Sequence, residues 1–145
     1  MVSIANPGAA SGPPAWFNGQ HLQLWFGDVV SESDARQLHT RAPNTVDIRN
    51  SLEFFRQAWR TEGSKVLVHC DYGASRSPGL AYVFVADQLG PGAEAEAFNT
   101  ILEIRPEAVP NGLVVKLADA FLARNGTLNQ PLKDLFRKIN SEFGM

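Results

Sequence analysis

The sequence predicts a single α/β domain with a small, mostly parallel β-sheet flanked by helices. Short apolar segments typical of buried strands alternate with longer segments in which apolar residues repeat at helical spacing. Such alternation favours a parallel sheet, because each helix returns the chain to the start of the next strand. The length of 145 residues is enough for one core and too short for two, so the domain is expected to span residues 1–145.

Two strands are expected near the start of the chain, at residues 2–5 and 21–26. The residues between them are rich in Gly, Ala, Ser and Pro, which is typical of a loop. A short helical turn is expected near residues 33–38. A longer helix is expected over residues 46–60, where apolar side chains recur on one face and charged side chains lie mostly opposite.

The third strand, at residues 66–68, leads through a short loop into a helix that extends to Leu89. Ser77 is a favourable N-cap and Pro78 suits the first helical position, so this helix is expected to begin there. The loop therefore precedes a helix N-terminus, where free backbone N–H groups and the positive end of the helix dipole attract anions. Helical spacing between turn residues predicts three further helices, at residues 93–105, 112–124 and 132–143.

The composition and charge argue against several classes of function. A net charge of −2 gives no basic surface for nucleic acid or an anionic membrane, and no apolar segment is long enough to span a bilayer. The N-terminus lacks the pattern of a signal peptide, and one cysteine permits no internal disulfide, so the cytoplasm is the expected compartment. No residues show metal-ligand spacing, and neither a metal nor a cofactor is expected.

The loop after the third strand combines the single thiol of the chain with a guanidinium. Cys70 begins this loop and Arg76 ends it, while Gly73 supplies the backbone freedom that a tight curl requires. The N–H groups of such a curl form a semicircle of donors, and the planar fork of an arginine matches two phosphate oxygens. The residues expected to hold a phosphoryl group are Asp71, Tyr72, Gly73, Ala74, Ser75 and Arg76.

Cys70 is the candidate nucleophile. The loop N–H groups, the helix dipole and the charge of Arg76 all favour an anion, so its pKa is expected to fall and a thiolate to form at neutral pH. Attack on phosphorus would give a cysteinyl-phosphate intermediate, and the Ser77 hydroxyl is placed to hydrogen-bond the departing thiolate. His69 is expected to point to the other face of the strand and to brace the loop through a hydrogen bond. The alternative is that Cys70 is a buried structural thiol. This is disfavoured because the residues around Cys70 all stand at the spacings that an anion-binding loop needs.

The pattern His-Cys-x5-Arg-Ser at residues 69–77 resembles the signature of the cysteine-dependent protein tyrosine phosphatases. The form VLVHC followed by SRSP is most similar to the dual-specificity branch, and especially to compact members from bacteria and their viruses. The resemblance implies a three-layer protein tyrosine phosphatase-like domain that is reduced at its N-terminal end. It also implies hydrolysis of phosphotyrosine, together with phosphoserine and phosphothreonine, in a phosphorylated protein or peptide.

The resemblance also implies roles for two residues outside the loop. HLQLWFGDV is similar to the family's strand and loop that carry the general acid, which assigns that role to Asp28; the alternative is a turn residue. EIRPEAVPNGLVVKL is similar to the family's segment ending in Pro-Asn, where Asn111 would support the loop or position water; the alternative is a helix N-cap. The stretch from Asp28 to Cys70 is long, so Asp34 is a rival candidate for the general acid. Asp47 is less favoured, because it falls within a predicted helix start.

Almost no residues precede the first strand, which departs from the family pattern. The sheet is therefore expected to have an edge that is exposed or covered by a partner chain, and an oligomer could form through that edge. Two other functions stay open. One is a phosphatase-like module that binds phosphoproteins without hydrolysing them. The other is sulfur transfer by a rhodanese-like protein, which the His-Cys start and the Arg-Ser end of the loop disfavour.

Overall fold

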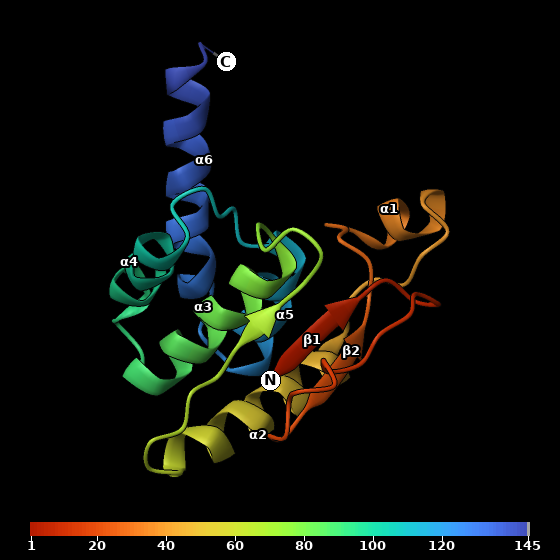
Figure 1. Ribbon diagram of the computed structural model, residues 1–145. Helices are drawn as coiled ribbons and strands as arrows, with labels where there is room; N and C mark the ends of the chain where they lie inside the picture. Colours follow the sequence, from red (N-terminus) through yellow and green to blue (C-terminus); the bar gives the residue numbers. More distant parts are fainter. Residues whose placement is uncertain (145) are drawn as a thin grey trace.

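Three parallel strands form the sheet of the computed structural model, which describes residues 1–144 (Figure 1). The central strand β1 (Val2–Ala5) pairs with β2 (Leu22–Trp25) on one side and with β3 (Val68–His69) on the other. Helices lie on both sides of this sheet. The predicted small α/β domain with a three-layer arrangement is therefore confirmed.

All three strands run in one direction, so their carboxyl ends meet at a single edge of the sheet. In parallel α/β sheets, ligands bind outside this edge, where the chain leaves the central strand toward opposite sides. The order β2-β1-β3 makes the end of β1 such a point. The loops that begin at residues 6, 26 and 70 consequently gather there.

The helical part of the chain follows the predicted order, with bounds that differ by a few residues. Between β2 and β3, α1 covers Glu32–Gln37 and α2 covers Thr45–Arg60. Within residues 1–144, no helix is both long and apolar enough to cross a membrane. The helices after β3 are α3 (Arg76–Leu89), α4 (Glu94–Ile104), α5 (Gly112–Phe121), the 3₁₀ helix η1 (Thr127–Asn129) and α6 (Gln130–Glu142).

The main core lies between one face of the sheet and helices α2, α3 and α5, which contact one another. Alternation along the strands turns Val2, Ile4 and Leu24 toward these helices, while Ser3 and Gln23 point to the opposite face. The core fixes α3 against β3, and therefore fixes the loop that connects them. The largest fully buried side chains of this core include Phe26, which follows β2, and the helical residues Ile48, Leu52, Phe55, Leu80 and Tyr82.

The start of α3 corrects one prediction. The helix begins at Arg76, with Ser75 at the N-cap position, so Ser77 and Pro78 are its second and third residues. The Ser77 hydroxyl does not cap the helix, because it lies 3.2 Å from the sulfur of Cys70. Ser75 makes no capping hydrogen bond either. The first turn of α3 therefore keeps backbone N–H groups available for other acceptors.

Candidate active site

The carboxyl-terminal edge of the sheet brings together side chains that are far apart in the sequence. Arg76 reaches across this edge and donates through Nη1 to the Oδ1 atom of Asn6, at 2.9 Å, and to the carbonyl oxygen of Phe26, at 3.0 Å. Asn6 follows β1, and Phe26 follows β2. Arg76 thus links the loop after β3 to the ends of the other two strands.

Cys70 lies half-buried at the start of the loop, with its Sγ atom 3.2 Å from the Oγ atom of Ser77. Burial by itself raises the pKa of this thiol. Hydrogen bonds from the Ser77 hydroxyl and from the backbone N–H groups of Ser77 and Gly73, together with the charge of Arg76, outweigh burial, so the pKa lies below its ordinary value. These hydrogen bonds and the charge of Arg76 stabilise the anionic form of the thiol.

The backbone of the loop is held from outside by the segment between α4 and α5. The N–H of Val109 donates to the carbonyl of Ala74 at 2.8 Å, and the N–H of Asn111 donates to the carbonyl of Ser75 at 3.0 Å. The guanidinium of Arg105 donates to the carbonyl of Tyr72 at 3.3 Å. Because these carbonyls bond outward, the loop N–H groups stay available for an anion.

Two conformational details shape the loop. Gly73 has φ = +65°, a backbone angle that residues with a side chain rarely adopt. The side chain of Tyr72 is 84% exposed, so it lies on the rim of the loop and not in the core. The curl that was expected from the glycine is therefore formed at this position.

The guanidinium of Arg76 is buried, with only 3% of the residue exposed. Nη1 is fully used by Asn6 and Phe26, and Nη2 donates to Asp71 at 3.3 Å. The Nε atom is buried and has no hydrogen-bond partner among residues 1–144. A buried donor without a partner is costly, and an anion bound beside Nε would satisfy it.

Asp28 lies next to the loop and is tied to it. Its Oδ1 atom accepts hydrogen bonds from the hydroxyl of Ser75, at 2.6 Å, and from the amide Nδ2 of Asn111, at 2.9 Å. The residue is exposed, and Oδ2 takes part in none of these bonds. One oxygen of the carboxylate is thus fixed, while the other is open to a substrate.

Asn111 combines the two functions that the sequence left open for it. Its Oδ1 atom accepts from the backbone N–H groups of Leu113 and Val114, at 3.0 Å each, and so caps α5. Its Nδ2 atom holds Asp28 and donates to the carbonyl of Val29 at 3.1 Å. The side chain of Asn111 therefore caps α5 and holds the loop that contains Asp28 and Val29.

The rival carboxylates occupy structural positions. Asp34 lies in the first turn of α1, where its backbone N–H donates to the Oγ atom of the N-cap Ser31. Asp47 forms a capping box with Asn44 at the start of α2 and a two-point ion pair with Arg41, at 2.8 and 3.0 Å. Of the three aspartates, only Asp28 is hydrogen-bonded to the loop between β3 and α3.

His69 points to the face of the sheet opposite the main core, as predicted, but it does not bond the loop. Its Nε2 atom lies 2.5 Å from the hydroxyl of Ser3 on β1, and Nε2 of His21 lies 2.9 Å from the same hydroxyl. Burial, the N-terminal ammonium and His69 together lower the pKa of His21. His69 therefore ties β3 to β1. No local sequence pattern indicates this cluster, because its members come from three separate strands or strand ends.

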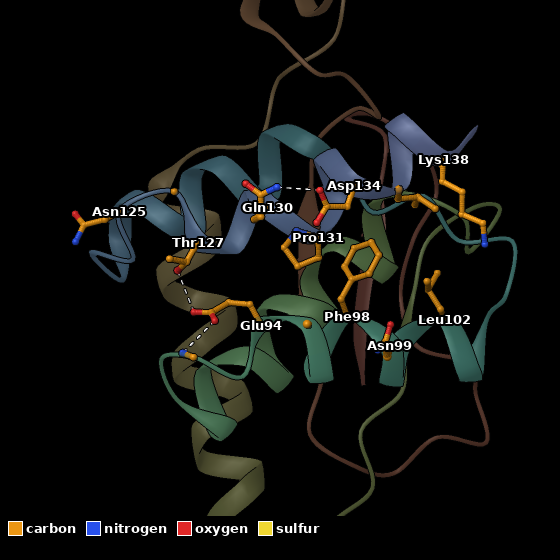
Figure 2. Close-up of a pocket in the computed structure, with 14 residues that line it drawn as sticks. Glu94, Phe98, Asn99, Leu102, Asn125, Thr127, Gln130, Pro131, Asp134 and Lys138 are labelled. Atoms are coloured by element: carbon orange, nitrogen blue, oxygen red, sulfur yellow. Dashed lines mark hydrogen bonds between the residues drawn. The ribbon is translucent and has the colours of Figure 1, made fainter. Parts of the chain in front are cut away.

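A hollow that shares no lining residue with this loop lies between α4, η1 and α6 (Figure 2). It has a volume of about 720 Å³, and its apolar floor is formed by Phe98, Leu102, Pro131 and Leu135. A smaller hollow of about 220 Å³ borders the loop and is lined in part by Gly73 and Ser77. Within the part of the chain that the structure describes, no cluster of His, Cys, Asp and Glu could hold a metal ion.

Comparisons of the chain with protein-family models, with curated proteins and with solved structures find no match. The interpretation of the site therefore depends on its residues and their geometry.

Proposed function

We propose that this protein is a cysteine-dependent phosphatase that hydrolyses phosphotyrosine in proteins or peptides, with phosphoserine and phosphothreonine as further substrates. The observation that carries the proposal is the buried guanidinium of Arg76. It lies near a thiol of lowered pKa, and one of its donors, Nε, has no partner within the described residues 1–144. A tetrahedral dianion above the sulfur would satisfy this donor together with the loop N–H groups.

In the first step, the thiolate of Cys70 attacks phosphorus and the bond from phosphorus to the substrate oxygen breaks. The sulfur–phosphorus bond of a cysteinyl phosphate forms as the alkoxide or phenoxide leaves. Asp28, protonated on its free Oδ2 atom, gives its proton to the leaving oxygen. The hydrogen bonds from Ser75 and Asn111 to Oδ1 support this role, because they fix the direction of Oδ2.

In the second step, water attacks phosphorus and releases inorganic phosphate. Asp28, now a carboxylate, takes the proton from the water. The sulfur–phosphorus bond breaks and its electron pair returns to Cys70 as a thiolate, which the hydroxyl of Ser77 stabilises at 3.2 Å. Neither step uses a metal or a cofactor, and the cytoplasm would keep the single thiol reduced.

The proposal is tested by hydrolysis of p-nitrophenyl phosphate and of a phosphotyrosine peptide. Wild type is expected to release phosphate from both, and Cys70→Ser is expected to have no measurable activity while keeping its fold. Asn18→Ala, in the loop after β1, is a matched control that should behave as wild type. Undiminished turnover by Cys70→Ser would rule the mechanism out.

A second candidate is a module that binds phosphoproteins without hydrolysing them. Calorimetric binding of a phosphotyrosine peptide to wild type, with no phosphate released over hours, would support this candidate. Release of phosphate that depends on Cys70 would eliminate it.

Association through the sheet edge stays a prediction. β3 is only two residues long and pairs with β1 on one side, and Leu67 just before it is exposed. An unpaired edge can accept a strand from a second copy. Sedimentation equilibrium of the full chain distinguishes a dimer from a monomer, and a monomer at all concentrations would contradict the prediction.

A further inference from the structure

The side chain of Asn6 contacts the phosphate-clamping arginine, and nothing in the sequence pattern indicated this contact. We propose that Asn6 is a positioning residue that sets the orientation of the Arg76 guanidinium for binding a phosphoryl group. The inference rests on the proposed function of the Cys70 loop and adds to it a residue from a different strand. Asn6 itself need not touch the substrate, because it acts through Arg76.

The hydrogen bonds of Arg76 divide its guanidinium into a held side and a free side. Both protons of Nη1 are used, one by Oδ1 of Asn6 at 2.9 Å and one by the carbonyl of Phe26 at 3.0 Å. The Nε–H and one N–H of Nη2 lie on the other edge of the planar group and point in the same direction. That edge is the one suited to two oxygens of a phosphate, and its Nε–H has no partner in residues 1–144.

The two acceptors on Nη1 fix the plane of the guanidinium, because each accepts a different proton. The carbonyl of Phe26 belongs to the backbone, so Asn6 supplies the side-chain half of this arrangement. Asn6 immediately follows the central strand β1, at the point where parallel sheets place their ligands. The strand therefore delivers the amide oxygen of Asn6 to the rim of the anion site.

Loss of the Asn6 contact would favour Asp71 over a phosphoryl group as the partner of Arg76. The carboxylate of Asp71 lies 3.3 Å from Nη2, and the Asp71 side chain is 54% exposed. With Asn6 absent, Arg76 would be held by the Phe26 carbonyl and by Asp71 alone. The guanidinium would then turn toward Asp71 and away from an incoming phosphoryl group.

The prediction is a loss of anion affinity without a loss of stability. Asn6 is exposed, and its backbone carbonyl already bonds the N–H of Ala9 in a turn, so Asn6→Ala should leave the unfolding midpoint nearly unchanged. Affinity for tungstate, a tetrahedral oxyanion, and kcat/KM for p-nitrophenyl phosphate should each fall about tenfold, because a hydrogen bond to a charged group is lost and only partly replaced by water. Asn18→Ala in the same loop is the matched control and should change neither quantity.

A double-mutant cycle with Arg76→Lys separates positioning from a merely structural role. Lysine cannot keep the planar fork, so Asn6→Ala should change tungstate affinity by less than about twofold in the Arg76→Lys background. An equal loss in both backgrounds would overturn the proposal, as would wild-type affinity in Asn6→Ala. Tungstate binding is measured by calorimetry, so the cycle decides the role of Asn6 even if the protein hydrolyses nothing. Absence of hydrolysis by wild type would instead count against the proposed function alone.

Discussion

Two buried arginines differ in their hydrogen bonding: Arg76 ends the loop at Cys70, and Arg124 pairs with Glu94, which lines the hollow between α4 and α6. Of the two, only Arg76 has a buried side-chain donor without a partner among residues 1–144. Glu94 lines the larger hollow, and its Oε1 atom accepts from Nη1 of Arg124 at 3.0 Å. The same oxygen accepts from the hydroxyl of Thr127, also at 3.0 Å (Figure 2). The N–H of Gly92 donates to the other oxygen of Glu94, at 3.0 Å. Every oxygen of this carboxylate therefore has a partner, and Arg124 closes an internal ion pair.

The loop at Cys70 differs in the hydrogen bonding of its buried arginine. Arg76 is at least as buried as Arg124, yet its Nε has no partner among residues 1–144, and a thiol of lowered pKa lies nearby. The volume of a hollow does not reveal such a donor. Unsatisfied buried donors beside a nucleophile are a better guide, because binding a ligand removes their cost.

Replacing the two arginines should separate catalysis from stability. Arg76→Ala is expected to lower kcat/KM for p-nitrophenyl phosphate by about 10²–10³-fold, because a donor to the developing charge is lost. Arg124→Ala leaves Glu94 buried without its ion-pair partner and should cost about 3 kcal/mol of unfolding free energy, with activity per folded molecule retained. Urea denaturation and steady-state kinetics measure both. The comparison fails if Arg124→Ala reduces kcat in the folded protein as strongly as Arg76→Ala.

Removing the acid should have the next largest effect. Asp28→Asn is expected to slow hydrolysis of a phosphoserine peptide by about 10²-fold, because an alkoxide leaves poorly without a proton. The loss should be smaller for p-nitrophenyl phosphate, whose leaving group is already stable. Asp34→Asn is the matched control and should retain wild-type rates. The reverse result, with Asp34 carrying the effect, would move the acid role to α1.

Removal of the Ser77 hydroxyl should change the pKa of Cys70. The Ser77 hydrogen bond favours the thiolate, so Ser77→Ala should raise the pKa of Cys70 toward its ordinary value. The midpoint of the pH dependence of alkylation by iodoacetamide would then shift to higher pH. A midpoint that stays at the wild-type pH would show that the backbone N–H groups and Arg76 account for the lowered pKa alone.

The smallest expected effect is a gain in affinity for inorganic phosphate. Asp71→Asn removes a carboxylate that competes with phosphate for Nη2 of Arg76. The Asp71 side chain is more than half exposed, so the gain in affinity for inorganic phosphate should be only about twofold to fivefold. Inhibition of turnover by phosphate measures it, with Asp134→Asn on α6 as the control. Weaker inhibition in Asp71→Asn would show that this carboxylate does not compete.

Local sequence signals predicted the elements of the site, and long-range contacts completed it. The loop, its glycine and the helix that follows are encoded within residues 66–89, so the sequence was sufficient for them. The predicted start of α3 was wrong. N-cap preference favours Ser77 at that position, but a tertiary hydrogen bond holds the Ser77 hydroxyl at Cys70. The bonds that place Arg76 and Asp28 span 70, 47 and 83 residues, and no local pattern indicates such partners.

In the proposed mechanism, Cys70 carries the phosphoryl group during turnover. Rapid acid quench of the wild-type protein during hydrolysis of p-nitrophenyl phosphate, followed by mass spectrometry of its peptides, tests this step. We expect one transient phosphoryl group on the peptide that contains Cys70, with longer-lived labelling in Asp28→Asn and none in Cys70→Ser. Turnover with the phosphoryl group on any other residue, or hydrolysis that continues in Cys70→Ser, would contradict it.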